Sequence, residues 1–187
     1  MSTPLADSSI AILIANGFKE DQITAVQRTL TKGKIPYKVL APEQGLVNGW
    51  QNKSWGHYFT VDAQISAAMG SDYDVLVIIG GSRGVEKLKT NPHTRRIVNH
   101  FLEAGKPIAA LGEAAELLAL SPKSAGLTVA CSSENLEALE TAQMKVSSEG
   151  QCLDGAVLTS TGKDIEGWVA AFVELITTNN KQDLQAA

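Results

Sequence analysis

Short apolar runs alternate with segments of helical period along most of the chain. Six runs are bounded by turn residues, at positions 10–15, 37–41, 75–79, 108–111, 127–130 and 156–160. Uninterrupted aliphatic runs are typical of strands buried on both faces, as in a parallel sheet covered by helices on each side. The pattern therefore predicts a doubly wound α/β fold with a mostly parallel central sheet. Its inner strands should be the most uniformly apolar runs, 10–15, 75–79 and 108–111.

Helix ends are marked most clearly between the third and fourth runs. Asn91 can cap a helix that starts at Pro92, because proline suits the first helical position, and Gly105 ends the pattern. Further helices are predicted over residues 21–31, after Ser133 and over residues 165–176. The last of these gathers large apolar side chains on one face, Trp168 and Phe172 among them, and should pack on the sheet.

Residues 45–61 break this rhythm, because two apolar pairs flank a polar middle that contains an Asn-Gly dipeptide. Such a pattern predicts a hairpin outside the main sheet. Four aromatic residues lie in it, Trp50, Trp55, Tyr58 and Phe59. Aromatic side chains are enriched at protein interfaces, so the hairpin is a candidate contact between copies of the chain.

The length of 187 residues is about one domain. We expect the domain to span residues 10–176, between polar tails at 1–9 and 177–187. The first residues contain no apolar stretch typical of a targeting segment, and no run approaches the length of a membrane span, so we expect no membrane partner.

The amino-acid composition limits which partners and which cellular compartment are expected. Sixteen Lys and Arg against twenty Asp and Glu give a net charge of -4, which offers no electrostatic footprint for nucleic acid. The two cysteines, Cys131 and Cys152, are too few for a disulfide framework or a zinc site built on thiolates. A reducing, cytoplasmic location is therefore favoured, and Cys152, in a polar loop, is expected to be incidental.

Ligands of open parallel sheets bind at the carboxyl ends of the strands, so the residues directly after the runs are candidates. They are 16–18, 80–84, 112–113 and 131–133. None of these turns carries a G-x-G-x-x-G or Walker pattern, so no nucleotide cofactor is predicted. The three histidines are scattered without ligand spacing, and no metal is predicted either.

The turn after the third run is rich in glycine. Gly81, Ser82, Arg83 and Gly84 could form a nest of backbone N–H groups for a small anion, with Arg83 as the countercharge. The alternative is a tight strand-to-helix turn with no ligand.

Residues 74–81, residues 105–111 and the Leu-Leu segment that follows resemble the skeleton of the DJ-1/PfpI superfamily, the class I glutamine amidotransferase-like proteins. The resemblance runs from about residue 10 to residue 176. It implies a flavodoxin-like three-layer sandwich and, together with the aromatic hairpin, a homo-oligomer that we expect to be a dimer.

The resemblance also exposes a difference at the strand-to-helix elbow. The family usually has Ala-Ile-Cys-His-Gly-Pro there, with the cysteine as nucleophile or redox-active thiol, whereas residues 110–115 read Ala-Leu-Gly-Glu-Ala-Ala. Gly112 then takes the place of the cysteine, Glu113 that of the histidine, and Gln22 that of the carboxylate that touches the thiol. Glycine adopts a strained turn readily but offers no nucleophile, so protease, amidotransferase and glyoxalase chemistry should be lost. The expected vestigial pocket comprises Gln22, Gly80, Gly81, Gly112, Glu113 and Cys131.

A second likeness lies inside the superfamily. Residues 106–109, Lys-Pro-Ile-Ala, followed by Gly112 and Glu113, are similar to the C-terminal domain of large-subunit catalases, which also lacks the elbow cysteine. That domain is separate from the haem-binding core, so the likeness implies no catalase activity.

Two functions remain open on the sequence. The first is a pseudoenzyme with no catalytic residues and no cofactor, acting as a non-hydrolytic binding, assembly or stress-associated module with a small-molecule or anion ligand. The second is a hydrolase, glyoxalase-like or isomerase-type enzyme that uses Glu113, and with it Cys131, in the inherited pocket. A catalytic Glu113 should lie in a cleft with a shifted pKa, whereas a structural one should face solvent or stabilise the start of its helix.

Overall fold

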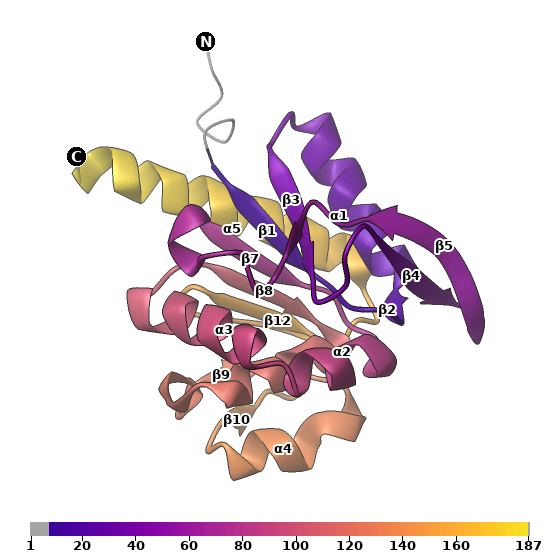
Figure 1. Ribbon diagram of the computed structural model, residues 1–187. Helices are drawn as coiled ribbons and strands as arrows, with labels where there is room; N and C mark the ends of the chain where they lie inside the picture. The colour runs from indigo at the N-terminus through magenta and orange to yellow at the C-terminus, as the bar shows by residue number, and fades with distance from the viewer. Residues whose placement is uncertain (1–7, 187) are drawn as a thin grey trace.

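The alternating runs form a seven-stranded sheet in the computed structural model, which describes residues 8–186 (Figure 1). The strand order is β11-β12-β8-β7-β1-β3-β6. The strands span β1 (Ile10–Leu13), β3 (Tyr37–Ala41), β6 (Ala63–Gln64), β7 (Val75–Ile78), β8 (Ile108–Leu111), β11 (Gln151–Asp154) and β12 (Val157–Ser160). All neighbouring pairs are parallel except β11 with β12. The predicted parallel α/β sheet is thus confirmed, with β1, β7 and β8 inside it.

Helices cover both faces of this sheet because the buried strands present apolar side chains to both. On one face lie α1 (Glu20–Lys32) and α5 (Ile165–Ala186), packed over Ile10, Ile12 and Val77 through Trp168 and Phe172. The other face carries α2 (Ser82–Lys89), α3 (Pro92–Ala104), α4 (Leu136–Thr141) and the 3-10 segments η2 (Gly70–Asp72), η3 (Gly112–Leu120), η4 (Pro122–Ser124) and η5 (Ser133–Asn135). The result is the expected three-layer sandwich.

The predicted ends of α3 are confirmed. The Asn91 side chain accepts the N–H of His93, Pro92 is the first helical residue, and Gly105 ends the helix in the left-handed conformation at φ +65°. None of the helices among residues 8–186 is long and apolar enough to cross a membrane.

The hairpin outside the sheet is confirmed as β4 (Leu46–Gln51) and β5 (Ser54–Thr60). It projects to one side of the molecule (Figure 1). The short strand β2 (Phe18–Lys19) pairs with β4 and sets Lys19 opposite Trp50. The hairpin is further tied to α1, because the buried Glu20 carboxylate accepts the backbone N–H of His57 at 2.9 Å.

One expectation about the main sheet is corrected. The run at 127–130 does not join the main sheet: β9 (Thr128–Val129) pairs with β10 (Lys145–Val146) instead. The place beside β12 belongs to β11, because a tight turn at Gly155, with φ +57°, returns the chain directly to its neighbour.

Residues 177–186, expected as part of a polar tail, continue helix α5 to Ala186. These residues extend a helix whose apolar face is already packed, and the Thr177 hydroxyl donates to the Val173 carbonyl. Residues 1–7 of the predicted N-terminal tail and residue 187 lie outside the described residues.

Candidate functional site

Three segments meet at the carboxyl ends of β1, β7 and β8. Lys19 comes from β2, Gly80 and Gly81 from the turn into α2, and Glu113 from the first turn of η3. Lys19 Nζ donates to both Glu113 carboxylate oxygens, at 2.8 and 3.1 Å. The Gly81 N–H donates to Glu113 Oε2 at 3.0 Å. Glu113 is therefore held on two sides and is only 7% exposed.

Gln22 binds the same turn one residue earlier. Its Oε1 accepts the Gly80 N–H at 2.8 Å, and the Gln22 side chain is buried at the start of α1. A Cβ on Gly80 would lie 2.5 Å from the Leu111 carbonyl oxygen, so only glycine lets this turn approach β8 so closely. The structure brings together Gln22, Gly80, Gly81 and Glu113, four of the residues that the sequence analysis assigned to the pocket.

Gly112, at the elbow itself, has φ +56°, a left-handed conformation that favours glycine. A Cβ built there would lie 3.7 Å from both Gln22 Nε2 and the Thr161 oxygen, and 4.0 Å from Lys19 Nζ. These are ordinary contacts, so the space beside Gly112 would admit a side chain. The cost of one lies in the backbone conformation rather than in a clash.

The carboxyl of Glu113 is tuned toward the ionised form. Burial raises the pKa of Glu113, but the hydrogen bonds from Lys19 and Gly81 and the charge of Lys19 outweigh burial and lower it below its ordinary value. A group with this pKa is a carboxylate near neutral pH, a hydrogen-bond acceptor rather than a proton donor. The Glu113 carboxylate therefore neither faces solvent nor lies unpaired in a cleft.

A cavity of about 280 Å³ opens beside this ion pair. It is lined by Gly17, Lys19, Trp50, Gly81, Ser82, Arg83 and Glu113. The guanidinium of Arg83 stacks over the Trp50 ring at 4.3 Å. Trp55 meets Trp50 edge to face, with the ring centroids 5.2 Å apart. Arg83 makes no ion pair with any residue between 8 and 179.

The glycine turn differs from the predicted anion nest. The Gly81 N–H already binds the protein's own Glu113 carboxylate, and Ser82 starts helix α2. Gly84 serves packing, because a Cβ there would lie 2.9 Å from the Ala15 carbonyl oxygen. Arg83 is the charged member of the set, and it lines the cavity together with Gly81 and Ser82.

A second cavity of about 250 Å³ lies on the other side of Glu113, between α2 and the segments η3 and η5. The buried Glu116 carboxylate lines it and is bound by Lys89 and by the Asn135 amide. Across the described residues, no group of three or more His, Cys, Asp or Glu side chains could hold a metal ion.

Neither cysteine belongs to the site. Cys131 is 7% exposed in the core beneath α4 and lines neither cavity. Burial raises the pKa of its thiol. Burial and the charge of Asp154 raise the pKa of Cys152 as well, and its thiol donates to the Thr128 carbonyl. Both thiols are less reactive than a free cysteine.

Sequence reasoning missed Lys19 and Trp50. Lys19 directly follows a segment that was singled out at the end of the first strand, but no local pattern connects it with Glu113, 94 residues away. Trp50 was noted only for its aromatic character, because the pairing of β2 with β4 that brings it to the cavity depends on tertiary structure.

The sequence model of the DJ-1/PfpI family matches residues 8–175, nearly the whole described chain. The chain belongs to the DJ-1/PfpI family. Protein DJ-1 homolog D of Arabidopsis thaliana is 38% identical over 64 residues, which are 34% of this chain and 16% of that protein. The match thus spans a small part of that curated relative.

Solved structures share the DJ-1/PfpI fold at low sequence identity. A ThiJ/PfpI domain protein from Brachyspira murdochii superposes with a TM-score of 0.81 at 18% identity, covering 91% of this chain and 96% of its own. DJ-1 of Schizosaccharomyces pombe has a TM-score of 0.78 at 16% identity, covering 94% and 98%. A protein from Anabaena variabilis with DJ-1/ThiJ/PfpI-like and ferritin-like domains has a TM-score of 0.82 at 22% identity, covering 90% and 48%. These likenesses establish the fold of this DJ-1/PfpI chain.

Proposed function

We propose that this DJ-1/PfpI protein has lost the thiol chemistry of its family and serves as a non-hydrolytic binding and assembly module. One observation carries the proposal. At the carboxyl end of the sheet, where an elbow thiol would act, Lys19 and the buried Glu113 form a partly buried ion pair beside a glycine in the elbow conformation. The pair gives Gly81 an acceptor, and neither cysteine lines the cavity beside it.

The two thiols support this reading by their positions. Cys131 and Cys152 lie away from the Lys19–Glu113 pair, and burial raises the pKa of both. A nucleophilic cysteine needs the opposite, a lowered pKa beside cationic groups. Unpaired thiols also fit the reducing, cytoplasmic location that we propose.

The enzyme alternative, with Glu113 as acid or base, is less well supported. A general acid needs its pKa near the working pH, whereas the pKa of Glu113 is lowered. Proton exchange would also require Glu113 to leave Lys19 and Gly81. Cys131 lines neither of the two cavities beside Glu113, from which it could assist.

The ligand of the proposed module is a small molecule with an anionic group. Lys19 and Arg83 bring two positive charges to the cavity against the single charge of Glu113, so an anion restores neutrality. Arg83 presents a planar set of N–H donors that suits a carboxylate. Trp50 adds a flat apolar wall, which favours an aromatic carboxylate over a bare ion.

Assembly is proposed through the hairpin. Leu46, Trp55 and Tyr58, on β4 and β5, are 55%, 52% and 68% exposed, and exposed large apolar side chains favour contact with another protein. A second copy of the chain that covers them would give the dimer expected from the sequence.

Binding and catalysis can be tested on the same protein. Benzoate should shift the amide resonances of Gly17, Ser82 and Arg83 in a saturable way, whereas benzyl alcohol should not. Arg83→Gln should weaken benzoate binding about tenfold, and Arg95→Gln, on α3 away from the cavity, should leave it unchanged. Peptide, glutamine amide or methylglyoxal turnover that disappears in the Cys131→Ser, Cys152→Ser double variant would refute the proposal.

A further inference from the structure

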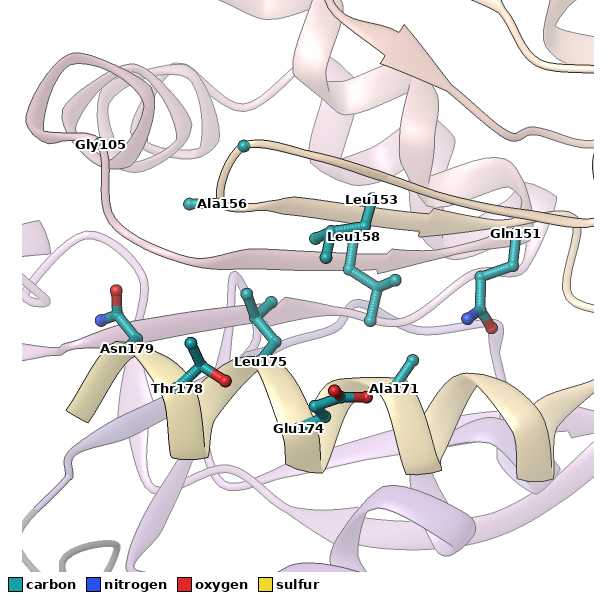
Figure 2. A pocket seen from close by; sticks show the side chains of 11 residues that line it. Gly105, Gln151, Leu153, Ala156, Leu158, Ala171, Glu174, Leu175, Thr178 and Asn179 are labelled. Carbon is teal, nitrogen blue, oxygen red and sulfur yellow. The ribbon is translucent and has the colours of Figure 1, made fainter. Parts of the chain in front are cut away.

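A cavity larger than the two beside Glu113 lies away from the Lys19–Glu113 pair. It is a groove of about 740 Å³ between the β11–β12 hairpin and the C-terminal half of α5 (Figure 2). None of its lining residues belongs to the cavity described above. The volume is in the range of sites that bind small organic molecules.

The groove exists because two helices are too few to cover this whole face of the seven-stranded sheet. Neighbouring strands lie about 4.8 Å apart and a helix is about 10 Å wide, so one helix covers about two strands. Within residues 8–186, only α1 and α5 pack on this side of the seven strands. The sheet therefore extends past α5 at its β11 end and leaves an uncovered strip.

The strip is apolar. Leu153 and Leu158 are paired across β11 and β12, and Figure 2 shows both above α5, where Ala171 and Leu175 form the facing wall. Leu153 is 57% exposed, whereas Leu158 beside it and Leu175 in the facing wall are buried. An apolar ligand that covers the exposed Leu153 side chain would remove its apolar surface from water, which favours binding.

A single charge marks one side of this strip. Glu174 is the only charged side chain among the lining residues, and it makes no ion pair within residues 8–179. The other polar lining groups, on Gln151, Thr178 and Asn179, are neutral hydrogen-bonding groups. Figure 2 shows Glu174 on the side of α5 that borders the groove.

We propose that this groove binds a small amphiphile with an alkyl or similar apolar body and a cationic ammonium head. The apolar body lies over Leu153 and Leu158, and the ammonium pairs with Glu174. Charge complementarity selects the cation over an anion or a neutral alcohol of the same length, because the groove offers a carboxylate and no basic group.

The probe is n-octylammonium chloride, titrated into isotopically labelled full-length protein and followed by NMR. Saturable shifts are expected at residues 151–158 and 171–179. Octanoate at the same concentrations should bind more weakly than octylammonium, with octanol between them. Equal binding of octanoate and octylammonium, or shifts that map elsewhere, would overturn the proposal, as would the absence of saturable shifts.

Two variants separate the head from the body of the ligand. Glu174→Gln should weaken octylammonium binding about threefold and leave octanol binding unchanged, with Glu166→Gln on the same helix as the matched control. Leu153→Gln should weaken both ligands about tenfold, with Leu136→Gln on α4 as its control. Unchanged octylammonium binding in Glu174→Gln or Leu153→Gln would contradict the assigned site. The Lys19–Glu113 cavity plays no part in this outcome, so the two proposals fail independently.

Discussion

Lys19 donates to both carboxylate oxygens of Glu113, and its ammonium lies 4.0 Å from where a Cβ on Gly112 would stand. A cation thus borders the space into which an elbow side chain would project. The ion pair connects β2 with η3 across the carboxyl end of the sheet. It places the glycine at position 112 and the carboxylate at position 113 in one arrangement.

Removing Lys19 should leave a buried carboxylate without its cation. We expect Lys19→Met to lower the free energy of unfolding by about 1–3 kcal/mol, because Lys19 itself is partly exposed and water screens the pair. The Lys19→Met, Glu113→Leu double variant should recover part of this loss. Urea unfolding of the two single variants and the double variant measures the coupling, and a coupling near zero would contradict a stabilising role for the pair.

The lowered pKa of Glu113 implies a dependence of stability on acid. Because the folded-state pKa lies below the ordinary value of 4.5, the contribution of Glu113 is complete above that value and is lost as pH falls through the folded pKa. Glu113→Gln should flatten the acid limb of unfolding free energy against pH. A residual slope should remain from Glu20, where burial raises the pKa but the hydrogen bonds and charge of His57 lower it overall. Identical acid limbs for wild type and variant would disprove the assignment.

Trp168 should be a main support of the α5 face. It is fully buried and stacks on Phe172, with the ring centroids 5.5 Å apart. Trp168→Ala should cost about 3–5 kcal/mol in denaturant unfolding. The indole Nε1 has no hydrogen-bond partner within the described residues, so Trp168→Phe should cost much less. Trp55→Ala, at a half-exposed position, is the control, and a loss there as large as at Trp168 would contradict the packing.

Restoring the family's residues tests the elbow geometry. In a Cys131→Ser, Cys152→Ser background, the triple change Gln22→Glu, Gly112→Cys and Glu113→His should give a thiol that titrates well below about 8.5. Lys19, released from Glu113, would then favour the thiolate. Stability should fall by about 1–3 kcal/mol, because a non-glycine residue must adopt φ +56°.

The measurement is the rate of iodoacetamide labelling against pH, with the single Gly112→Cys variant as the comparison. A labelling midpoint near 8.5 without any loss of stability would show that position 112 is an ordinary turn. The correspondence between Gly112 and the family's cysteine would then be wrong.

Self-association should depend on the hairpin surface. Tyr58 is 68% exposed, so Tyr58→Glu should disrupt a contact there without disturbing the fold. Sedimentation velocity should show the wild type as a dimer and the variant as a monomer, whereas Leu153→Gln should leave the dimer intact. A wild type that is monomeric at high concentration would refute the proposed assembly.

Periodicity was enough to predict the elements whose burial is uniform. The aliphatic runs of β1, β7 and β8 and the capped ends of α3 carry their signals within a few residues, because strand burial and helix capping are local properties. The same logic correctly placed Gly80, Gly81 and Glu113 at one edge of the sheet, since parallel strands end together.

Contacts between distant segments could not be read in this way. The ion pair of Lys19 with Glu113 and the approach of Trp50 to Arg83 both join residues far apart in the chain. Which residues meet depends on the twist and order of the strands. The residues adjacent to them in the sequence do not indicate these contacts. The residue types at the elbow are therefore legible in the sequence, whereas the cation that neutralises Glu113 and the cavity beside it arise only when the chain is folded.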